Sequence, residues 1–354
     1  MKKNFLISTG GSGGHVIPAT ILYEHLSKNN NVIISTDKRG LKFLDKDIYN
    51  FEIIDTPKLN NIFFFPLNFF VIIYLIFKSI FLLKNKKIDK IFSTGGYMSL
   101  PVIFAGRLLN LSIFLVEPNL VLGRSNKYFL NSCKKIFCYN KQIKNFPEKF
   151  QSKIIKIDPL VRENIYKLKD TKKETDKFTI LIVGGSQGAK VFDENLKDLI
   201  VKISKKNDFR VIHQTSENNV SHLSNFYIKN NIDNKIFSFT NDFANLVQQA
   251  DLCITRAGAS TLAELSVLNI PFIAVPLPSS KDNHQFENAN FYRENDCCWL
   301  IEQIFLQKGI EEILNDIFID KNGYKKKKEN LIKLNYQNTW NNVNQKIKQT
   351  IDEN

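Results

Sequence analysis

Two glycine-dense turns are the first chemical signal in this sequence. The stretch GGSGGH occupies residues 10–15 and GGSQGA occupies residues 184–189, each directly after a short apolar run. Glycine lets backbone N–H groups approach an anion closely, and the start of a following helix adds N–H groups without intrahelical partners. The first turn has neither the GxGxxG spacing of dinucleotide-binding proteins nor the GK[ST] of P-loop NTPases. It indicates an anion near a helix N-terminus and disfavours those two classes, with a purely structural tight turn as the alternative.

A third polar segment, RAGASTLAE at residues 256–264, also follows an apolar run. A helix is expected to begin near Ala259, which places the hydroxyls of Ser260 and Thr261 in its first turn, where they suit a diphosphate. Glu264 lies one turn further on and could accept two hydrogen bonds from a ribose diol. A capping box is the alternative for this glutamate. The later stretch KDNHQ supplies Asp282, His284 and Gln285, which suit sugar hydroxyls.

Short apolar runs alternate with helix-length segments, a pattern that predicts a parallel α/β sheet. The pattern restarts after a polar stretch at residues 163–177, which we interpret as a linker. Each half thus has its own glycine-rich turn after an early strand, so two Rossmann-like domains are predicted. The last segment, about 324–352, is expected to be helical. The expected strands are 4–8, 31–36, 51–55, 89–94, 112–116 and 135–139 in the first half, and 178–183, 210–214, 235–239, 251–255 and 271–275 in the second.

The composition favours a protein with sizeable cores and no metal centre. Hydrophobic residues make up 43% of the chain, and its five scattered cysteines include no CxxC pair, which indicates reduced thiols. The DKD at 45–47 follows no clear strand and is interpreted as surface. The formal net charge is +14, but the lysine-rich run 321–330 is typical of a solvated face, and no arginine-rich or RNP-like signature favours nucleic acid. The apolar run at the N-terminus is too short for a signal peptide.

One segment, residues 62–83, is apolar enough to span a bilayer by length alone. Pro66, Asn68 and Lys78 interrupt it, and it occupies the crossover between two predicted strands of one sheet. We therefore expect a helix with one face on the sheet and an apolar face, including Phe69, Ile73 and Phe77, turned to an anionic membrane surface through residues 62–87. A fully buried crossover helix and a transmembrane helix are the alternatives.

Six motifs together resemble the MurG-type glycosyltransferases. In chain order they are GGSGGHVIPA, STGGYMSLP, VEPN, GGSQGA, RAGASTLAE and KDNHQFENA, spread over nearly the whole chain. The resemblance implies an α/β GT-B fold, in which two Rossmann-like domains with parallel sheets face a cleft. It divides the chain into an acceptor- and membrane-binding domain, 1–160, and a UDP-sugar-binding domain, 161–339, with a C-terminal helix, about 340–354, packed on the first domain.

The resemblance also implies a reaction and the residues that perform it. These enzymes move N-acetylglucosamine from UDP-N-acetylglucosamine to undecaprenyl-linked lipid I, without a cofactor, as peripheral proteins on the cytoplasmic face of the cell membrane. They invert the anomeric centre, which requires a general base, and the candidates are His15 and Glu117. The first glycine turn is expected to hold the acceptor's diphosphate. The family's donor contacts fall on Ser12, Gly13, Gly14, Asn119, Arg162, Ser186, Thr240, Ala259, Ser260, Thr261, Leu262, Ala263, Glu264, His284 and Gln285.

Two rival functions remain open at this stage. A nucleotide-sugar epimerase, or a glycosyltransferase with another acceptor, could share the scaffold and the uridine site. A non-enzymatic membrane scaffold leaves the polar motifs without a purpose.

Overall fold

The computed structural model describes residues 2–57, 65–169, 176–238, 240 and 243–354, without the side chains of 65–67 and 186–189. It consists of two compact units, Met1–Val161 with Thr339–Asn354, and Arg162–Asn338. Unit 1 is therefore built from both ends of the chain, and unit 2 from its middle.

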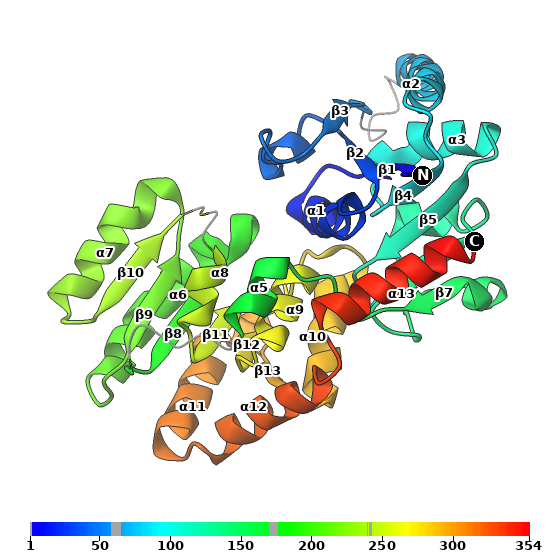
Figure 1. The fold of residues 1–354 in the computed structure, drawn as a ribbon. Coiled ribbons are helices and arrows are strands. Elements are labelled where there is room, and N and C mark those ends of the chain that lie inside the picture. The colour runs from blue at the N-terminus through cyan, green and yellow to red at the C-terminus, as the bar shows by residue number, and fades with distance from the viewer. Residues whose placement is uncertain (1, 58–64, 170–175, 239, 241–242) are drawn as a thin grey trace. The chain divides into compact units, whose positions relative to one another are not determined.

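Unit 1 contains a seven-stranded, wholly parallel sheet in the order β3-β2-β1-β4-β5-β6-β7, with helices on its faces (Figure 1). Its inner strands are almost fully buried, which explains their continuous apolar sequences. Phe92, Phe114 and Phe137 stack on neighbouring strands, with ring centroids 5.3 and 6.2 Å apart. The strands are β1 (Asn4–Ser8), β2 (Asn31–Thr36), β3 (Phe51–Ile53), β4 (Lys90–Ser93), β5 (Ser112–Glu117), β6 (Lys135–Cys138) and β7 (Ile154–Lys156).

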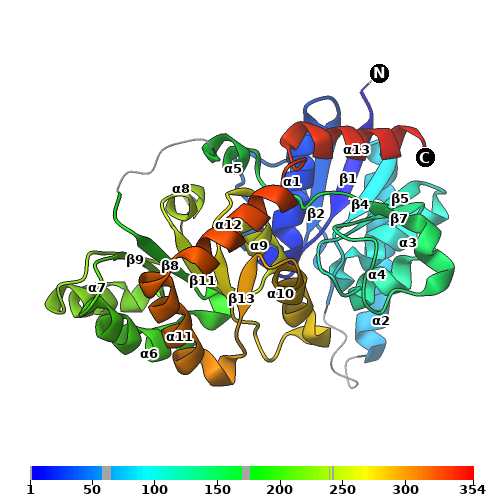
Figure 2. The same cartoon turned by 90° about the horizontal axis from the view of Figure 1, so that it is seen from below.

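The helices of unit 1 include the crossover helix and the C-terminal helix. They are α1 (Gly13–Ser27), α2 (Phe65–Asn85), α3 (Leu100–Leu108), α4 (Arg124–Phe129) and α13 (Trp340–Asp352), with short 3-10 turns at Gly40–Phe43, Tyr97–Ser99 and Glu148–Lys153. The ring of Trp340 in α13 stacks on the imidazole of His25 in α1, with ring centroids 3.6 Å apart. Both termini lie side by side, joined by an ion pair of 3.1 Å between Lys3 and Asp352 (Figures 1 and 2).

Unit 2 contains a six-stranded parallel sheet in the order β10-β9-β8-β11-β12-β13. Buried clusters on its faces form the core. The strands are β8 (Thr179–Val183), β9 (Arg210–Gln214), β10 (Asn234–Phe237), β11 (Leu252–Thr255), β12 (Phe272–Ala274) and β13 (Cys298–Leu300). The helices are α5 (Glu163–Leu168), α6 (Gly185–Ser204), α7 (Val220–Lys229), α8 (Phe243–Gln248), α9 (Ala259–Val267), α10 (His284–Glu294), α11 (Leu306–Ile319) and α12 (Asn322–Leu334), with 3-10 turns at Glu217–Asn219, Lys281–Asn283 and Gln303–Phe305.

Three sequence expectations need correction. Residues 163–177 are not simply a linker, because α5 begins at Glu163 and packs against α8 and α9; residues 170–175 lie outside the described residues. The polar C-terminal segment is two helices, because Thr339 starts α13 by accepting a hydrogen bond from the backbone N–H of Asn342 (3.2 Å). Two edge strands, β7 and β13, were not predicted.

Candidate active site

The polar motifs of unit 1 gather where the strand order of its sheet reverses. The chain runs from β1 outward to β2 and β3, and then returns to place β4 on the other side of β1. The first glycine turn follows β1, and residues Thr94–Tyr97 follow β4. In open α/β sheets, ligands bind outside the carboxyl ends of the strands at such a switch point.

The first glycine turn has a backbone that other residues would not tolerate. Gly10 and Gly11 have φ of 150° and 80°, and a Cβ on Gly10 would lie 2.5 Å from Asp37 Oδ1. Asp37 holds the turn by accepting from the backbone N–H of Gly11 at 2.8 Å. The N–H groups of His15 and Val16 donate to the carbonyl of Ser12. Gly13 and Gly14, at the start of α1, therefore present the N–H groups that an anion would meet.

His15 lies in the first turn of α1 and reaches the loop after β4. Its Nδ1 is 2.9 Å from the carbonyl oxygen of Thr94. A carbonyl oxygen only accepts, so Nδ1 carries the hydrogen of the neutral ring and Nε2 carries the lone pair. A Cβ on Gly96 would lie 3.6 Å from His15 Cδ2, which places the ring beside that glycine. The half-buried imidazole is thus in the tautomer that can take up a proton at Nε2.

Glu117, the other candidate base, is buried and surrounded by protein donors. Its carboxylate accepts from the backbone N–H of Gly123 (2.8 Å), from Asn126 Nδ2 (2.9 Å), and from the backbone and side chain of Asn119 (3.2 and 3.1 Å). Burial raises the pKa of Glu117 against the effect of these hydrogen bonds. These hydrogen bonds make Glu117 the residue that holds loop 117–123, which carries Asn119.

Unit 2 repeats this arrangement at its own switch point, between β8 and β11. Gly185, in the turn after β8, has φ of 65° and donates its backbone N–H to Gln214 Oε1 at 2.9 Å. Gln214 Nε2 in turn donates to the carbonyl of Ser238 at 3.3 Å. The side chain of Ser186 lies outside the described part of the chain, as do both neighbours of Thr240, so the structure adds nothing on these two predicted contacts.

Helix α9 presents its N-terminus after β11, as expected for a diphosphate site. The first intrahelical backbone bond runs from Leu262 N to Gly258 O, which leaves the N–H groups of residues 259–261 without an intrahelical acceptor. The side chains of Ser260 and Thr261 are half-buried, whereas Leu262 packs in the core and Ala263 is buried. Those last two residues offer no side chain to a ligand.

Glu264 does not form a capping box, so that alternative is wrong. The N-cap of α9 is Gly258, and Glu264 is the sixth residue of the helix. The glutamate is buried, and Arg162 Nε lies 3.0 Å from its Oε1 without the alignment of a hydrogen bond. Burial raises the pKa of Glu264, and the charge of Arg162 opposes the rise. A buried carboxylate oxygen without an aligned hydrogen-bond donor is unusual, and here the charge of Arg162 is its nearest compensation.

The predicted sugar contacts lie at the start of α10. His284 Nδ1 donates to the carbonyl of Lys281 (2.8 Å), and Gln285 Oε1 accepts from the backbone N–H of Leu277 (2.9 Å). Asn288 Nδ2 donates to the carbonyl of Ala257 at 3.2 Å, which ties α10 to the turn before α9. The structure therefore brings His284, Gln285 and the α9 N-terminus together within unit 2.

Among the residues that the structure describes, no group of three or more His, Cys, Asp or Glu side chains could hold a metal ion. Asp45 and Asp47 of the DKD stretch are exposed.

Family models match both units of the chain. Residues 5–138 match the glycosyltransferase family 28 N-terminal domain, and residues 179–343 match the glycosyltransferase family 28 C-terminal domain. The chain belongs to glycosyltransferase family 28. Both switch points described above fall within these family 28 domains.

Relatives of this family 28 chain carry specific names. It is 49% identical over 356 residues, covering 100% of both chains, to the UDP-N-acetylglucosamine–N-acetylmuramyl-(pentapeptide) pyrophosphoryl-undecaprenol N-acetylglucosamine transferase of Pelagibacter ubique. It is 37% identical over 316 residues to the protein of the same name from Rickettsia felis, covering 86% of this chain and 87% of the relative.

Solved structures show the same GT-B fold. The crystal structure of Acinetobacter baumannii MurG matches with a TM-score of 0.75 and 23% identity, covering 100% of both chains. A UDP-N-acetylglucosamine 2-epimerase matches with a TM-score of 0.61 and 14% identity, covering 93% and 91%. The fold alone therefore does not separate a family 28 transferase from an epimerase.

Two charged residues beside the first glycine turn were not predicted from the sequence. Asp37 and Arg39 follow β2. Asp37 accepts from the backbone N–H of Gly11 in the turn, and Arg39 donates to Asp37. An acidic residue after the second strand of a Rossmann-like unit is a known signal, about 20 residues beyond the glycine turn. The stretch STDKRG at 35–40 carries it.

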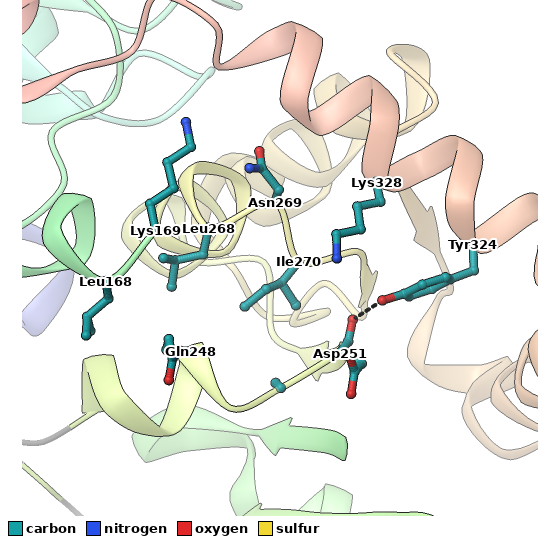
Figure 3. A pocket seen from close by; sticks show the side chains of 10 residues that line it. Leu168, Lys169, Gln248, Asp251, Leu268, Asn269, Ile270, Tyr324 and Lys328 are labelled. Atoms are coloured by element: carbon teal, nitrogen blue, oxygen red, sulfur yellow. Dashed lines mark hydrogen bonds between the residues drawn. The ribbon is translucent and has the colours of Figure 1, made fainter. Parts of the chain in front are cut away.

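A cavity of about 190 Å³ in unit 2 lies away from these residues (Figure 3). Asp251, Asn269, Tyr324 and Lys328 are among the residues that line it, and Tyr324 donates to the carbonyl of Asp251 at 3.1 Å. Asp251 precedes β11, so the cavity is at the amino end of that strand, opposite the α9 N-terminus. It includes no predicted site residue of the family 28 chain.

Proposed function

We propose that this protein transfers N-acetylglucosamine from UDP-N-acetylglucosamine to the C4 hydroxyl of N-acetylmuramoyl-pentapeptide on undecaprenyl pyrophosphate. The reaction converts lipid I to lipid II in peptidoglycan synthesis. The observation that carries the proposal is the full-length relative of 49% identity that is named for this transfer. The anion-binding turns at both switch points support it, because donor and acceptor each contain a diphosphate.

Unit 2 holds the donor in this proposal. The N–H groups of residues 259–261, with the hydroxyls of Ser260 and Thr261, bind the UDP diphosphate. The carboxylate of Glu264 accepts hydrogen bonds from the ribose hydroxyls. Arg162, which pairs with this carboxylate in the structure, then either moves away or shares the carboxylate with the ribose. His284 and Gln285 lie beside the sugar. The positive end of α9 stabilises the departing diphosphate, as a metal does in other glycosyltransferases.

Unit 1 holds the acceptor and the base. The first glycine turn binds the lipid diphosphate through Gly13 and Gly14. His15 Nε2 takes the proton of the C4 hydroxyl as that oxygen forms a bond to C1 of the donor sugar. The bond from C1 to the diphosphate oxygen breaks at the same time, and its electron pair leaves with UDP. One displacement of this kind inverts the anomeric centre.

The proposal includes peripheral attachment to the cytoplasmic face of an anionic membrane. Among the described residues, one helix, Asn68–Asn85, is long and apolar enough to cross a bilayer by length and composition. It packs on α3 through buried Leu75 and Leu83, and Lys78 Nζ donates to the carbonyl of Ile53 at 3.1 Å. A helix held this way between β3 and β4 of one sheet suits attachment to the membrane surface better than insertion across it.

The outer face of α2 and α3 forms an apolar patch, every member of which is at least 45% exposed: Phe70, Tyr74, Phe77, Phe81, Phe104 and Leu108. Exposed Lys84 and Arg107 lie on the same two helices. Aromatic side chains with basic residues nearby are typical of surfaces that bind anionic membranes. Of the three residues expected on this face, Phe69 and Phe77 are exposed and Ile73 is half-buried. Phe70 and Tyr74 extend the exposed row.

The test measures consumption of UDP-N-acetylglucosamine with and without a lipid I analogue. Release of UDP and glycosylated product only with the analogue supports the proposal. Epimerised donor without acceptor would identify an epimerase. Vesicle binding with neither reaction would identify a membrane scaffold.

A further inference from the structure

A charged cluster at the end of β2 has no role in the function described so far. Asp37 is fully buried, and its Oδ2 accepts from Arg39 Nε and Nη2 at 2.8 and 2.6 Å. Arg39 Nη2 also donates to the hydroxyl of Tyr97, and its guanidinium lies 5.2 Å from the centroid of that ring. Arg39 is thereby fixed between the ends of β2 and β4.

Asp37 ties this arginine to the first glycine turn. Its Oδ1 accepts from the backbone N–H groups of Gly11 (2.8 Å) and Gly40 (2.9 Å), so both of its oxygens have protein donors. Burial alone would raise the pKa of Asp37, but the hydrogen bonds from Gly11, Gly40 and Arg39 outweigh it and lower the pKa. A single ionised carboxylate thus positions the turn and the guanidinium relative to each other.

Arg39 keeps donors that point away from this anchor. Of its five N–H groups, those on Nη1 have no hydrogen-bond partner among the residues that the structure describes, and its side chain is 38% exposed. A Cβ on Gly11 would lie 3.9 Å from Arg39 Nη2, which puts the guanidinium directly beside the turn. The hydroxyl of Tyr97 accepts from Arg39, so its own hydrogen is available to donate.

We propose that Arg39, supported by Tyr97, binds the diphosphate of the acceptor at the first glycine turn. The inference rests on the proposed function, which places that diphosphate there. Arginine binds phosphate oxygens with paired, charge-assisted hydrogen bonds, and Asp37 holds the guanidinium in position before the ligand arrives. Together with the N–H groups of Gly13 and Gly14, this surrounds the diphosphate from two sides.

The test compares three soluble probes, farnesyl diphosphate, farnesyl monophosphate and farnesol, binding to the wild-type protein and to Arg39→Gln. Losing a charge-assisted hydrogen bond costs about tenfold or more in affinity. We expect that loss for farnesyl diphosphate, a smaller loss for the monophosphate, none for farnesol, and unchanged UDP affinity. Arg39→Lys, which keeps the charge but not the paired donors, should lose less than Arg39→Gln. Tyr97→Phe should weaken the diphosphate probe alone.

Lys38→Gln is the matched control, because it removes a cation one residue away that is 76% exposed and pairs with Asp55. It should bind all probes normally. Unchanged diphosphate affinity in folded Arg39→Gln overturns the inference. An equal loss of affinity for all three probes also overturns it, because Arg39 would then act only by stabilising the local structure.

Turnover by the wild-type protein separates this result from the proposed function. Normal turnover with unchanged diphosphate affinity in Arg39→Gln refutes the inference alone. If the wild-type protein is inactive but its diphosphate binding depends on Arg39, the proposed function is refuted. The inference that Arg39 binds a diphosphate then still stands.

Discussion

At the scale of single residues, one hydrogen bond determines the tautomer of His15. The carbonyl of Thr94 fixes the hydrogen on Nδ1, so proton uptake falls to Nε2. Loss of a general base costs about 10²–10⁴ in rate. We expect His15→Ala to reduce turnover by that order, with UDP-N-acetylglucosamine affinity within about threefold of wild type.

The control for this prediction is His222→Ala, which removes an exposed histidine on α7. It should leave turnover unchanged. Near-normal turnover of folded His15→Ala would return the role of base to Glu117, despite the four protein donors around that carboxylate.

Glu264 supports a second prediction at this scale. Glu264→Gln should weaken UDP-N-acetylglucosamine binding about tenfold or more, since hydrogen bonds to a charged group are worth about 1.5–3 kcal/mol. Burial already raises the pKa of this carboxyl, so a neutral isostere should not lower the melting temperature. Calorimetric titration and a thermal melt measure the two effects. Glu194→Gln, which changes an exposed carboxylate on α6, serves as the control. A lower melting temperature with normal donor affinity would make the Arg162 pair structural.

The sequence predicted those residues that belong to local patterns. The glycine turns and the serine and threonine at the α9 N-terminus are readable from a few consecutive residues. The partners of Glu264 and of Asp37 were not, because Arg162 and Gly11 lie far from them in the chain. The donors that saturate Glu117 also depend on the folding of loop 117–123, which no spacing rule gives.

At the scale of secondary structure elements, α2 carries the clearest prediction. Phe77→Ser with Phe81→Ser should reduce binding to anionic vesicles at least about tenfold, because burying one such side chain contributes about 1.5–3 kcal/mol. High salt should weaken the remaining binding, since basic residues contribute to it. Vesicle sedimentation measures both effects.

The matched control replaces Ile304 and Phe305 with serine, because these apolar residues of unit 2 are 79% and 57% exposed. That variant should bind vesicles like the wild type. If extraction from cells needs detergent even at high salt and alkaline pH, α2 spans the bilayer and the peripheral proposal fails.

Elements with long apolar runs were predicted well, and short or polar ones were not. Strands β7 and β13 have three residues each, too few to show a pattern. Helix α5 lies in a charged stretch and is stabilised by its contacts with α8 and α9. The break before α13 depends on Asn335, whose side chain donates to the carbonyl and the hydroxyl of Ser266 at 2.9 and 2.8 Å.

At the scale of the whole molecule, the packing of Trp340 in α13 on His25 in α1 should make the stability of the fold depend on pH. Burial lowers the pKa of His25 to about 3 from an ordinary value of 6.5. The folded protein therefore resists a proton that the unfolded chain accepts. Stability that is complete above pH 6.5 should fall as the pH drops from 6.5 toward 3, by about 1.4 kcal/mol per pH unit at most.

His25→Phe should keep the stack on Trp340 and remove this contribution, which flattens the pH dependence. The chain has two tryptophans, so a Trp299→Phe background leaves Trp340 as the fluorescent reporter of unit 1. Urea unfolding at several pH values gives the comparison, with His222→Phe as the exposed control. An unchanged slope in His25→Phe would assign the acid sensitivity to other groups.

The division of unit 1 between the two ends of the chain has a consequence for biosynthesis. A ribosome makes all of unit 2, Arg162–Asn338, before it makes α13, and Tyr166 can already donate to Asn338 (2.7 Å) when unit 2 is complete. Domains generally fold as their sequences emerge. Unit 1 begins before unit 2 but cannot pair His25 with Trp340 until residues 339–354 have been translated. Although unit 1 precedes unit 2 in the chain, it therefore finishes folding after unit 2.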